Sequence, residues 1–427
     1  MPNTPPDNPL YDVIIVGSGP AGNSAAYFLK RGGKRVLILE KDHLPRYKAC
    51  GGGLSPRFIR EQFPFTFDPV PIDDVAAITY IYNQQVTTVP LTPGVVGMVM
   101  RDDFDAYLLR QSGAEVLEGS AVRAVRELTD RVEVETRDGR CFSSRYLIGA
   151  DGANSIVAHA LGLRKRRSMA AAIEVEVLAP PEAARYFDHQ MAFIFSEIHY
   201  GYLWVFSKQD HLSVGIGALH PKPGELQQTL KRVMARYGIS LEGAVFHGHP
   251  IPIYTHSERI ASARTLLAGD AAGLADPLSG EGIRFAIKSG RMAAEAILSG
   301  HPELYTRNLQ RSIGMNHYLT ILVSISFYYL QEIYLFFGAP NPYCTAGIVD
   351  MLADRMSAAQ FIILGVLTMP VFALTEISAQ LLRILGLGKL SDRLRSALYP
   401  SDVHTALSSR DMDVSAIGAD TATYTIP

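Results

Sequence analysis

The chain has 427 residues, enough for two or three domains, and its composition of 48% hydrophobic and 19% charged residues fits a globular protein with a large core. The net charge of −2 provides no positive field, which argues against a nucleic-acid partner. Three cysteines exclude a disulfide framework and suit a reducing compartment, and the first ten residues show no pattern of a secretory signal.

Residues 11–41 predict a strand, a tight turn, a helix and a second strand. An apolar run at 13–16 is followed by Gly17, Gly19 and Gly22 in the spacing G-x-G-x-x-G. Glycines at these positions let the backbone turn sharply and approach a pyrophosphate, whose charge lies at the helix N-terminus. Glu40 follows about 20 residues on, where a carboxylate accepts hydrogen bonds from ribose hydroxyls. The pattern predicts a dinucleotide site and by itself leaves FAD and NAD(P) both open.

The next segment, residues 43–57, is too rich in glycine for a regular element. Cys50 precedes Gly51, Gly52 and Gly53 and lies among three cations. Glycines here permit close approach of the backbone to a flat ligand. Cys50 is therefore a candidate functional residue, and the alternative is a buried small hydrophobe.

Alternating residues at 75–89 predict strands, and residues 96–109 predict a strand followed by a helix. Asp102 or Asp103 lies near the expected helix cap, and Arg101 at the junction can face a phosphate or a flavin edge or be a solvated surface arginine. Residues 115–128 and 131–136 predict a β-meander, and a later strand leads into Asp151-Gly152.

Residues 168–255 predict an inserted sheet domain with strands near 172–178, 191–196, 200–206 and 212–218 and a helix at 226–237. Tyr200, Tyr202, Trp204 and Phe206 alternate along the third of these strands, so we expect them to share one face. Taken alone, that face is better explained by a plain hydrophobic core.

Residues 266–286 predict a strand that ends at Gly269-Asp270 and a helix that begins near Ala271 and is broken by Pro277. A second helix is predicted to begin at Gly280-Glu281-Gly282 and to end near residue 298. A helix N-terminus with bare amides can hold the negative charge of a reduced flavin. The alternative is a turn between two helices.

Two apolar segments follow. Residues 319–338 are interrupted only by Gln331 and Glu332, and residues 356–375 contain no charge but include Pro370. We expect membrane-surface helices, with buried packing helices or a spanning helix as alternatives. Residues 401–427 have the composition of a polar tail, and no metal-ligand cluster or internal repeat is evident.

Together these residues resemble the geranylgeranyl reductase family, FAD flavoproteins built like para-hydroxybenzoate hydroxylase. The resemblance covers about residues 10–310 and rests on the glycine fingerprint with Glu40, the segment 47–53, Arg101 with Phe104-Asp105, the two Asp/Gly motifs, and the loop 280–282. The family's substrate-strand motif is kept at Tyr202, Trp204 and Phe206, whereas His199 and Ser207 replace its prolines. The arginine usual after the first Asp-Gly motif falls at Ala158, so the motif supplies no nicotinamide-binding arginine there.

The resemblance implies an α/β fold: a Rossmann-type FAD-binding domain, an inserted antiparallel-sheet substrate domain and a helical, membrane-associating C-terminal region. We expect the FAD-binding domain at 10–165 plus 256–310, the sheet domain at 166–255, the helical region at 311–400 and the tail at 401–427. The implied activity is saturation of C=C bonds in a prenyl chain on a lipid, quinone or chlorophyll-like substrate by hydride transfer from reduced flavin. The alternatives are an FAD monooxygenase or halogenase of the same fold, and a membrane flavoprotein that passes electrons to quinone.

The implied partners are a prenyl lipid, a membrane surface and an electron donor that is ferredoxin, NADPH or a quinol. The implied location is the cytoplasmic side of a membrane, with peripheral or monotopic attachment. Cys50, Tyr202 and Trp204 are the expected catalytic residues, and Tyr200, Tyr202, Trp204 and Phe206 are expected to line the substrate. The expected FAD-binding residues are Gly17, Gly19, Pro20, Ala21, Gly22, Glu40, Lys41, Cys50, Gly51, Gly52, Arg101, Asp151, Gly269, Asp270, Gly280, Gly282 and Ile283.

Overall fold

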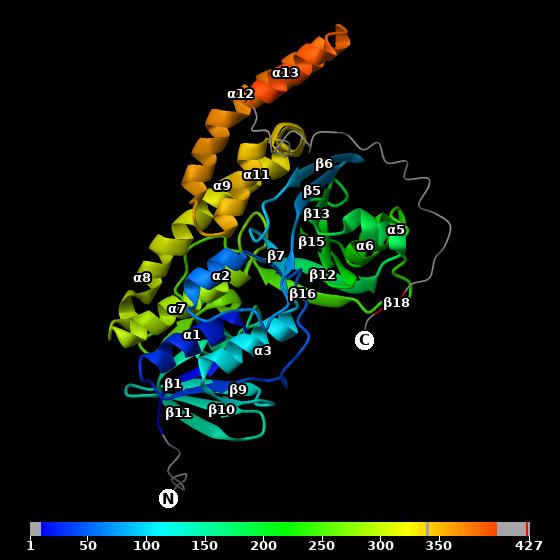
Figure 1. The fold of residues 1–427 in the computed structure, drawn as a ribbon. Helices are drawn as coiled ribbons and strands as arrows, with labels where there is room; N and C mark the ends of the chain where they lie inside the picture. Colours follow the sequence, from blue (N-terminus) through cyan, green and yellow to red (C-terminus); the bar gives the residue numbers. More distant parts are fainter. Residues whose placement is uncertain (1–9, 339–340, 399–423, 426–427) are drawn as a thin grey trace, which may run out of the picture. The chain divides into compact units, whose positions relative to one another are not determined.

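The computed structural model describes residues 10–338, 341–398 and 424–425, and its contacts divide the chain into two compact units (Figure 1). Unit 1 comprises Met1–Lys48, Met100–Ala170 and Pro250–Ile321, and unit 2 comprises Ala49–Val99, Ala171–His249 and Leu322–Pro427. The sequence-based division placed residues 49–99 in the FAD-binding domain, whereas their contacts group them with the inserted sheet. The reason is strand pairing, because β5 (Ala77–Tyr82) pairs in parallel with β13 (Gln190–Phe195).

Unit 1 is built on a seven-stranded mixed sheet in the order β8-β2-β1-β11-β10-β9, with β17 also paired to β11. Strands β1, β2, β8, β11 and β17 run parallel, whereas β9, β10 and the first half of β11 form an antiparallel meander. The predicted meander also included residues 115–117, but these form β8, which pairs in parallel with β2. Chain connections leave β1 toward β2 on one side and toward β11 on the other, so the C-terminal end of β1 is the switch point where such sheets bind ligands. The strands are β1 (Tyr11–Val16), β2 (Val36–Leu39), β8 (Glu115–Leu117), β9 (Val122–Glu127), β10 (Val132–Thr136), β11 (Cys141–Gly149) and β17 (Thr265–Leu267).

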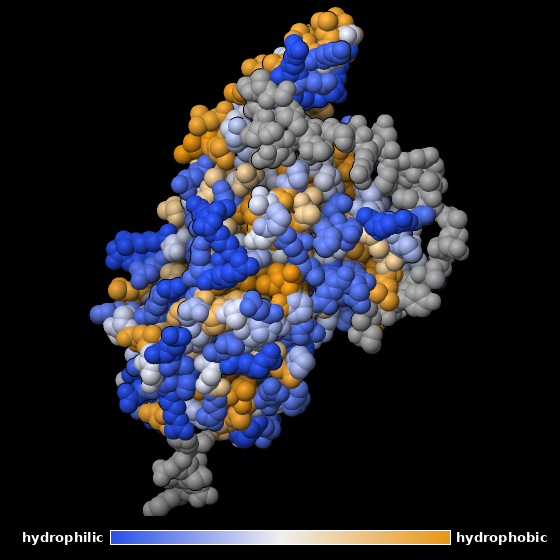
Figure 2. All heavy atoms as spheres, viewed as in Figure 1, coloured by the Kyte–Doolittle hydropathy of each residue, from blue (hydrophilic) through white to orange (hydrophobic). Residues whose placement is uncertain are grey.

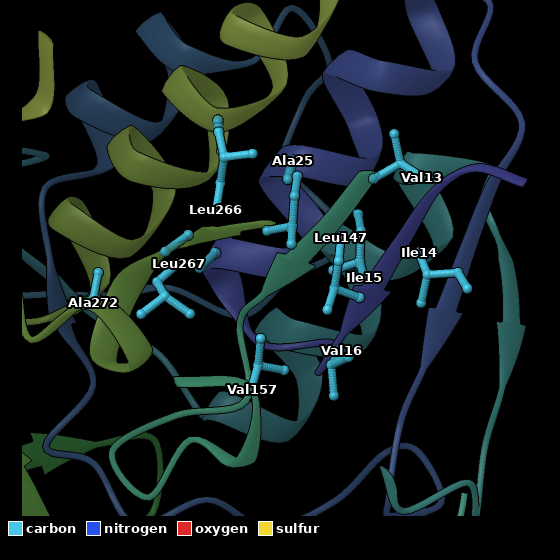
Figure 3. Packing of buried hydrophobic residues seen from close by; sticks show 14 of the residues in the cluster. Val13, Ile14, Ile15, Val16, Ala25, Leu147, Val157, Leu266, Leu267 and Ala272 are labelled. Carbon is cyan, nitrogen blue, oxygen red and sulfur yellow. The ribbon is translucent and has the colours of Figure 1, made fainter. Parts of the chain in front are cut away.

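The core of unit 1 lies between this sheet and its helices. Figure 3 shows Val13, Ile15, Leu147 and Leu266 among the aliphatic side chains that pack there. All four are fully buried, as expected for parallel strands covered on both faces. The helices are α1 (Pro20–Arg31), α3 (Arg101–Ser112), α4 (Ile156–Ala160), α7 (Ile283–Leu298) and α8 (Tyr305–Leu309), with short turns η1 (Gly269–Ala272), η2 (Pro302–Leu304) and η3 (Gln310–Gly314).

Unit 2 holds an eight-stranded sheet in the order β16-β12-β15-β14-β13-β5-β6, with β18 also paired to β12, and a small sheet in the order β3-β7-β4. The four predicted strands and the helix of the inserted domain are confirmed. The sheet was expected to be antiparallel, but it is mixed, because β5 from outside the inserted segment pairs in parallel with β13. The elements are β3 (Gly53–Leu54), α2 (Pro56–Gln62), β4 (Asp73–Asp74), β5, β6 (Gln85–Pro90), β7 (Gly97–Met98), β12 (Met169–Leu178), α5 (Pro181–Phe187), β13, β14 (Gly201–Lys208), β15 (His211–Leu219), α6 (Glu225–Ala235), β16 (His247–Pro252) and β18 (Tyr424–Thr425).

The two faces of the large sheet differ in chemistry. Helices α5 and α6 cover one face, which is aliphatic, with Leu203, Val205 and Val214 packed in a continuous cluster. Tyr202, Trp204 and Phe206 alternate with these residues and therefore lie on the opposite face. We call this opposite side the aromatic face.

Helices of the C-terminal third complete unit 2. The long apolar helix α12 continues through Pro370, so the proline does not end it, and Ser357 with Gln360 forms a capping box at its start. α12 is the one helix among the described residues that is long and apolar enough to cross a membrane, and only 17% of its most apolar window is buried. The elements are α9 (Met315–Tyr329), which begins in unit 1, then α10 (Gln331–Ile333), η4 (Tyr334–Gly338), α11 (Pro342–Leu352), α12 (Ala358–Ile384) and α13 (Gly388–Leu398). Apart from β18, the predicted tail 401–427 lies outside the described residues.

Candidate flavin site and aromatic face

The predicted glycine turn lies at the C-terminal end of β1. A Cβ on Gly17 would lie 2.4 Å from the Ala150 carbonyl oxygen, and one on Gly22 would lie 2.0 Å from the Gly17 oxygen. Only glycine fits at these two positions, because any side chain would overlap neighbouring backbone atoms of the protein itself. The tight fit brings strand β11, the turn and helix α1 together.

Gly19 differs from its neighbours, because a Cβ there would meet no heavy atom within 4 Å. It is the N-cap of α1, no side chain caps that helix, and Pro20 and Ala21 begin its first turn. Open space at an uncapped helix N-terminus is the environment that suits a pyrophosphate. The residues present therefore fit the phosphates of FAD.

Glu40 follows β2 and is 3% exposed. Its carboxylate accepts hydrogen bonds from the Ser18 amide at 2.8 Å and the Ser18 hydroxyl at 2.6 Å, and from the Asp42 amide at 3.0 Å. Burial alone would raise the pKa of the Glu40 carboxyl, but these hydrogen bonds and the Arg46 charge hold it below its ordinary value. Glu40 is thus an ionised acceptor beside the glycine turn, whereas the neighbouring Lys41 is exposed and pairs with Asp42 at 3.7 Å.

Arg101 begins α3, after Met100 as N-cap, and is buried. Its guanidinium donates to both oxygens of Asp105, at 3.0 and 2.9 Å, and Arg46 donates to the same carboxylate at 3.3 Å. Asn23 of α1 reaches the Asp105 carbonyl oxygen at 2.9 Å. The segment R-x-x-F-D therefore holds its arginine in a bidentate pair and joins α3 to α1, and a solvated surface arginine is excluded.

The first Asp/Gly motif caps a helix. Asp151 accepts from the Ser155 hydroxyl at 2.6 Å and from the amides of Ile156 at 2.7 Å and Val157 at 3.2 Å, at the N-terminus of α4. Burial raises the pKa of the Asp151 carboxyl although these bonds oppose the shift. The Asp151 carboxylate is thus occupied with capping α4, so this motif would contribute to a cofactor site through its backbone, whose conformation the carboxylate holds.

The second Asp/Gly motif forms the single 3-10 turn η1 and does not begin the longer helix that the sequence predicts at Ala271. Gly273, in the left-handed region at φ +71°, ends the turn. Gly269 donates its amide to Ser289 Oγ at 2.9 Å, and Arg164 donates to the Asp270 carbonyl oxygen at 2.7 Å. Burial and the charge of Arg167 lower the pKa of Arg164 to about 10, so the guanidinium that holds this turn remains charged at neutral pH.

The predicted helix after Gly280 is confirmed as α7, with Gly282 as N-cap and Ile283 as its first residue. No side chain caps it, and its first turn contains no acidic residue. Among the described residues of unit 1, two long helices therefore begin at glycine without a side-chain cap, α1 and α7. Such helix ends suit the phosphates and the anionic ring of a reduced flavin.

In unit 2, the Cys50 loop lies on the aromatic face. A Cβ on Gly51 would lie 2.7 Å from the Phe206 ring, and one on Gly52 would lie 2.2 Å from the Val99 carbonyl oxygen. Glu174 accepts the Cys50 amide at 2.9 Å, and Lys208 donates to the Cys50 carbonyl oxygen at 3.2 Å. Cys50 is half-buried, and both hydrogen-bonding groups of its backbone are anchored to the sheet.

The predicted aromatic stripe is present. The rings of Tyr202 and Trp204 have centroids 6.4 Å apart, and those of Trp204 and Phe206 lie 6.3 Å apart. Gly215 on β15 leaves room for the indole, because a Cβ there would lie 2.0 Å from Trp204. Among the described residues, the buried indole Nε1 has no hydrogen-bond partner.

The C-terminal segment packs on the same face. Phe195 contacts Phe327 with ring centroids 5.4 Å apart and shares a buried cluster with Leu335. Burial raises the pKa of Tyr80 on β5 to about 12, which marks this part of the face as poorly solvated. Apolar residues of α9 and η4 therefore help to build the aromatic face.

Tyr200 does not belong to the stripe as predicted. It precedes β14 in a left-handed conformation at φ +48°, so strand alternation does not place its side chain. It is exposed, and its ring lies 6.0 Å from that of Tyr328. The prediction was wrong because the strand begins one residue later than the aromatic spacing suggests.

Several supporting residues were not predicted from the sequence. Asn23 and Arg46 join the elements around the glycine turn, and Arg164 and Ser289 hold η1. One available signal was the pair Glu174 and Glu176, whose charges alternate with valines in a strand that is otherwise apolar. Charged residues in such a strand indicate buried partners on one face.

Comparison with known proteins agrees with this geometry. The family model described as an FAD binding domain matches residues 10–61 and 83–299. An uncharacterized protein of Methanosarcina barkeri is 32% identical over 355 residues, covering 81% of this chain and 90% of its own. The geranylgeranyl diphosphate reductase of Rhodobacter capsulatus is 34% identical over 309 residues, covering 68% of this chain and 75% of its own.

Two further proteins broaden the comparison. A menaquinone reductase of Mycolicibacterium smegmatis is 27% identical and covers 74% of this chain and 86% of its own length. The crystal structure of a geranylgeranyl bacteriochlorophyll reductase-like protein from Thermoplasma acidophilum aligns with a TM-score of 0.69 at 22% identity, covering 85% of this chain and 97% of the other. The structural likeness supports the fold, and the sequence matches support FAD as the cofactor.

Proposed function

Because the chain belongs to the geranylgeranyl reductase family of FAD-dependent oxidoreductases, we propose that it saturates carbon–carbon double bonds in the prenyl chain of a lipid, quinone or chlorophyll-like substrate. The observation that carries this proposal is the aromatic face of unit 2. Its stripe of Tyr202, Trp204 and Phe206 lies beside the Cys50 loop. An uncharged aromatic wall binds a hydrocarbon chain and can also stabilise a developing cation.

The chemistry explains why such a wall is useful. An isolated trisubstituted alkene has no carbonyl to accept electron density, so attack by hydride alone would leave an unstabilised carbanion. Proton addition to the less substituted carbon, with hydride reaching the carbon that becomes cationic, avoids this problem. When bound, reduced FAD supplies the hydride. The protein residues bind and orient the chain, exclude water and provide the proton, for which Cys50 is the candidate donor.

The residues around FAD have separate roles in the proposal. Gly19 would leave space for the pyrophosphate, Glu40 would accept hydrogen bonds from the ribose, and the starts of α1 and α7 would stabilise negative charge. The arginine that related hydroxylases keep is replaced by Ala158, which is buried. Ferredoxin, NADPH and a quinol therefore all stay open as the electron donor.

The proposal includes attachment to a membrane surface. Exposed apolar residues continue along α12, and Val366, Leu367 and Leu374 each expose about two thirds of their area (67%, 66% and 67%). Figure 2 shows apolar side chains gathered over this helix. Lys389 follows its last turn, and a cation there favours anionic headgroups. Arg383 and Arg395 are paired with Asp392 and Glu376 within the protein. We place the protein at the cytoplasmic surface, peripheral or monotopic.

Anaerobic turnover tests the enzymatic proposal. Dithionite-reduced enzyme is mixed with a detergent-dispersed prenyl alcohol or prenylquinone, and the products are analysed by mass spectrometry. We expect a gain of two hydrogens for each bond reduced, located in the tail. Reduction confined to a quinone ring would support the electron-transfer alternative, and products that appear only with oxygen would support a monooxygenase.

Vesicle sedimentation tests the attachment. The variant Val366→Asp with Leu374→Asp places two charges on α12, and Gln227→Asp on the exposed side of α6 is the control. We expect the double variant to lose binding to vesicles that contain anionic lipid while the control retains it. Equal binding of all three proteins would overturn attachment through α12.

A further inference from the structure

Four charged side chains lie buried on the aromatic side of the unit 2 sheet. Glu174 and Glu176 come from β12, Lys208 ends β14 and His211 begins β15, and none is more than 9% exposed. Burying charges costs free energy even when they are paired. An aliphatic row would stabilise the sheet as well, as Val175 and Val177 do on its other face. The charges therefore call for an explanation beyond packing.

These groups form a path from solvent to the backbone carbonyl oxygen of Cys50. Asp210, whose side chain is 79% exposed, lies 3.1 Å from His211 Nδ1, and His211 Nε2 lies 3.1 Å from Glu176 Oε2. Glu176 Oε1 accepts from Lys208 Nζ at 3.0 Å, and Lys208 Nζ donates to the Cys50 carbonyl oxygen at 3.2 Å. Every gap is thus no longer than 3.2 Å, although the His211–Glu176 pair is not aligned as a hydrogen bond.

The path ends beside the aromatic stripe. Lys208 continues the alternation of Tyr202, Trp204 and Phe206 along β14, and it pairs with His211 across the β14–β15 hairpin. Its ammonium is therefore on the aromatic face, next to the residue that the proposed reaction uses as proton donor.

Each group is suited to moving a proton. Burial lowers the pKa of His211, but its contacts with Glu176 and Asp210 outweigh that effect and leave it raised. Burial likewise opposes ionisation of Glu176, yet His211 and Lys208 hold its pKa below the ordinary value. The groups that face His211 are therefore Glu176, Asp210 and Lys208. The two carboxylates favour an imidazolium that donates toward Glu176, whereas the Lys208 charge opposes it.

We infer that Asp210, His211, Glu176 and Lys208 form a relay that returns a proton to Cys50 after each turnover. This inference rests on the proposed alkene reduction. The Cys50 S–H bond breaks, its proton forms a C–H bond at one alkene carbon, and hydride from reduced FAD forms the other. Lys208 then protonates the Cys50 thiolate, Glu176 passes a proton from His211 to Lys208, and His211 recovers one from solvent at Asp210. Each cycle consumes one solvent proton and one hydride.

The alternative is that the same contacts only fix the Cys50 loop. The two roles affect different turnovers. A relay is needed only after the first proton has been used, whereas fixing the loop matters for every turnover. In wild-type enzyme, we expect equal rates for the first and later turnovers. In His211→Gln and Glu176→Gln, we expect a first turnover close to the wild-type rate and later turnovers slower by about tenfold or more. The experiment uses FAD-loaded enzyme, a prenyl substrate in excess, and quench-flow with continuous supply of reductant.

A matched control and a rescue complete the test. His256→Gln also removes an imidazole paired with a carboxylate, Glu258 at 2.7 Å, but it lies in unit 1. We expect the control to leave both phases unchanged, and imidazole in the buffer to restore later turnovers of His211→Ala. Equal slowing of the first and later turnovers would show a positioning role, and no slowing would exclude the relay. Failure of the proposed function is distinct, because wild-type enzyme would then yield no saturated product.

Discussion

Two glycine-rich segments of this protein use glycine for different reasons. In the turn 17–22 of unit 1, Gly19 faces open space, whereas Gly17 and Gly22 touch neighbouring backbone. In the loop 51–53 of unit 2, a Cβ on any of the three glycines would lie within 2.8 Å of protein atoms. The first segment leaves space for a ligand, and the second is filled by the protein itself.

The difference shows that a glycine run does not by itself identify a binding surface. The sequence predicts close approach to a ligand at both segments, a pyrophosphate at 17–22 and a flat ligand at 51–53. At Gly51 and Gly52, the close approach is to the Phe206 ring and the Val99 backbone. These contacts press the Cys50 loop onto the aromatic face, so the glycines position Cys50.

The largest effect is expected for Gly22→Ala. The new methyl group would lie 2.0 Å from the Gly17 oxygen, so α1 must move away from the turn. We expect a loss of about 3 kcal/mol or more in the free energy of unfolding, together with loss of bound FAD. Urea denaturation and the flavin absorbance measure the two effects. Gly365→Ala, in a helix with no atom near the new Cβ, is the control and should stabilise slightly, by about 0.5–1 kcal/mol.

A somewhat smaller effect is expected for Gly52→Ala. The position combines φ +79° with a Cβ 2.2 Å from the Val99 oxygen. We expect about 2–3 kcal/mol of destabilisation and loss of alkene reduction while FAD stays bound. Gly94→Ala has a similar φ of +77° but no neighbour within 4 Å, so it should cost only about 1 kcal/mol. Equal losses in the two variants would show that the Val99 contact is unimportant.

Gly19→Ala separates ligand contact from folding. Its Cβ enters open space, so the apoprotein should keep its stability within about 0.5 kcal/mol. The same methyl group would occupy the space assigned to the pyrophosphate, and we expect FAD affinity to fall by about tenfold, or about 1.4 kcal/mol. Calorimetric titration of apoprotein with FAD measures this affinity. Unchanged affinity would contradict the placement of the phosphates.

The smallest effect is a pH dependence at Glu40. Its folded pKa is held below the ordinary value of 4.5, so its stabilisation is complete above that pH and is lost as pH falls through the lowered folded value. We expect wild-type unfolding free energy to decline in this acidic window more steeply than that of Glu40→Gln. Parallel curves from urea melts at several acidic pH values would contradict an ionised Glu40 in the folded state.

Much of the fold and of the flavin site follows from local sequence. Apolar runs predict β1 and β2, the glycine spacing predicts the turn at the switch point, and Gly280 to Gly282 predict the start of α7. These features are local because each depends on residues a few positions apart. The grouping of residues 49–99 with the inserted sheet was not predictable in this way, because it depends on pairing between β5 and β13.

The site residues show the same contrast between local features, which the sequence predicts, and long-range contacts, which it does not. Tyr202, Trp204 and Phe206 share a face because alternation is a local property of a strand, and Tyr200 departs because the strand starts after it. The sequence identifies Asp151 and Arg101 as polar residues of interest, yet their partners at α4 and Asp105 appear only in the folded chain.

By itself, the sequence determined the cofactor class, the family and the order of the main elements, since glycine spacing and hydrophobic period act over short distances. Only the tertiary structure decided which glycines face open space and which charges are buried beside Cys50. The physical reason is that burial and close contact depend on side chains from distant strands, such as Glu176, Lys208 and His211, that meet only when the sheet has formed.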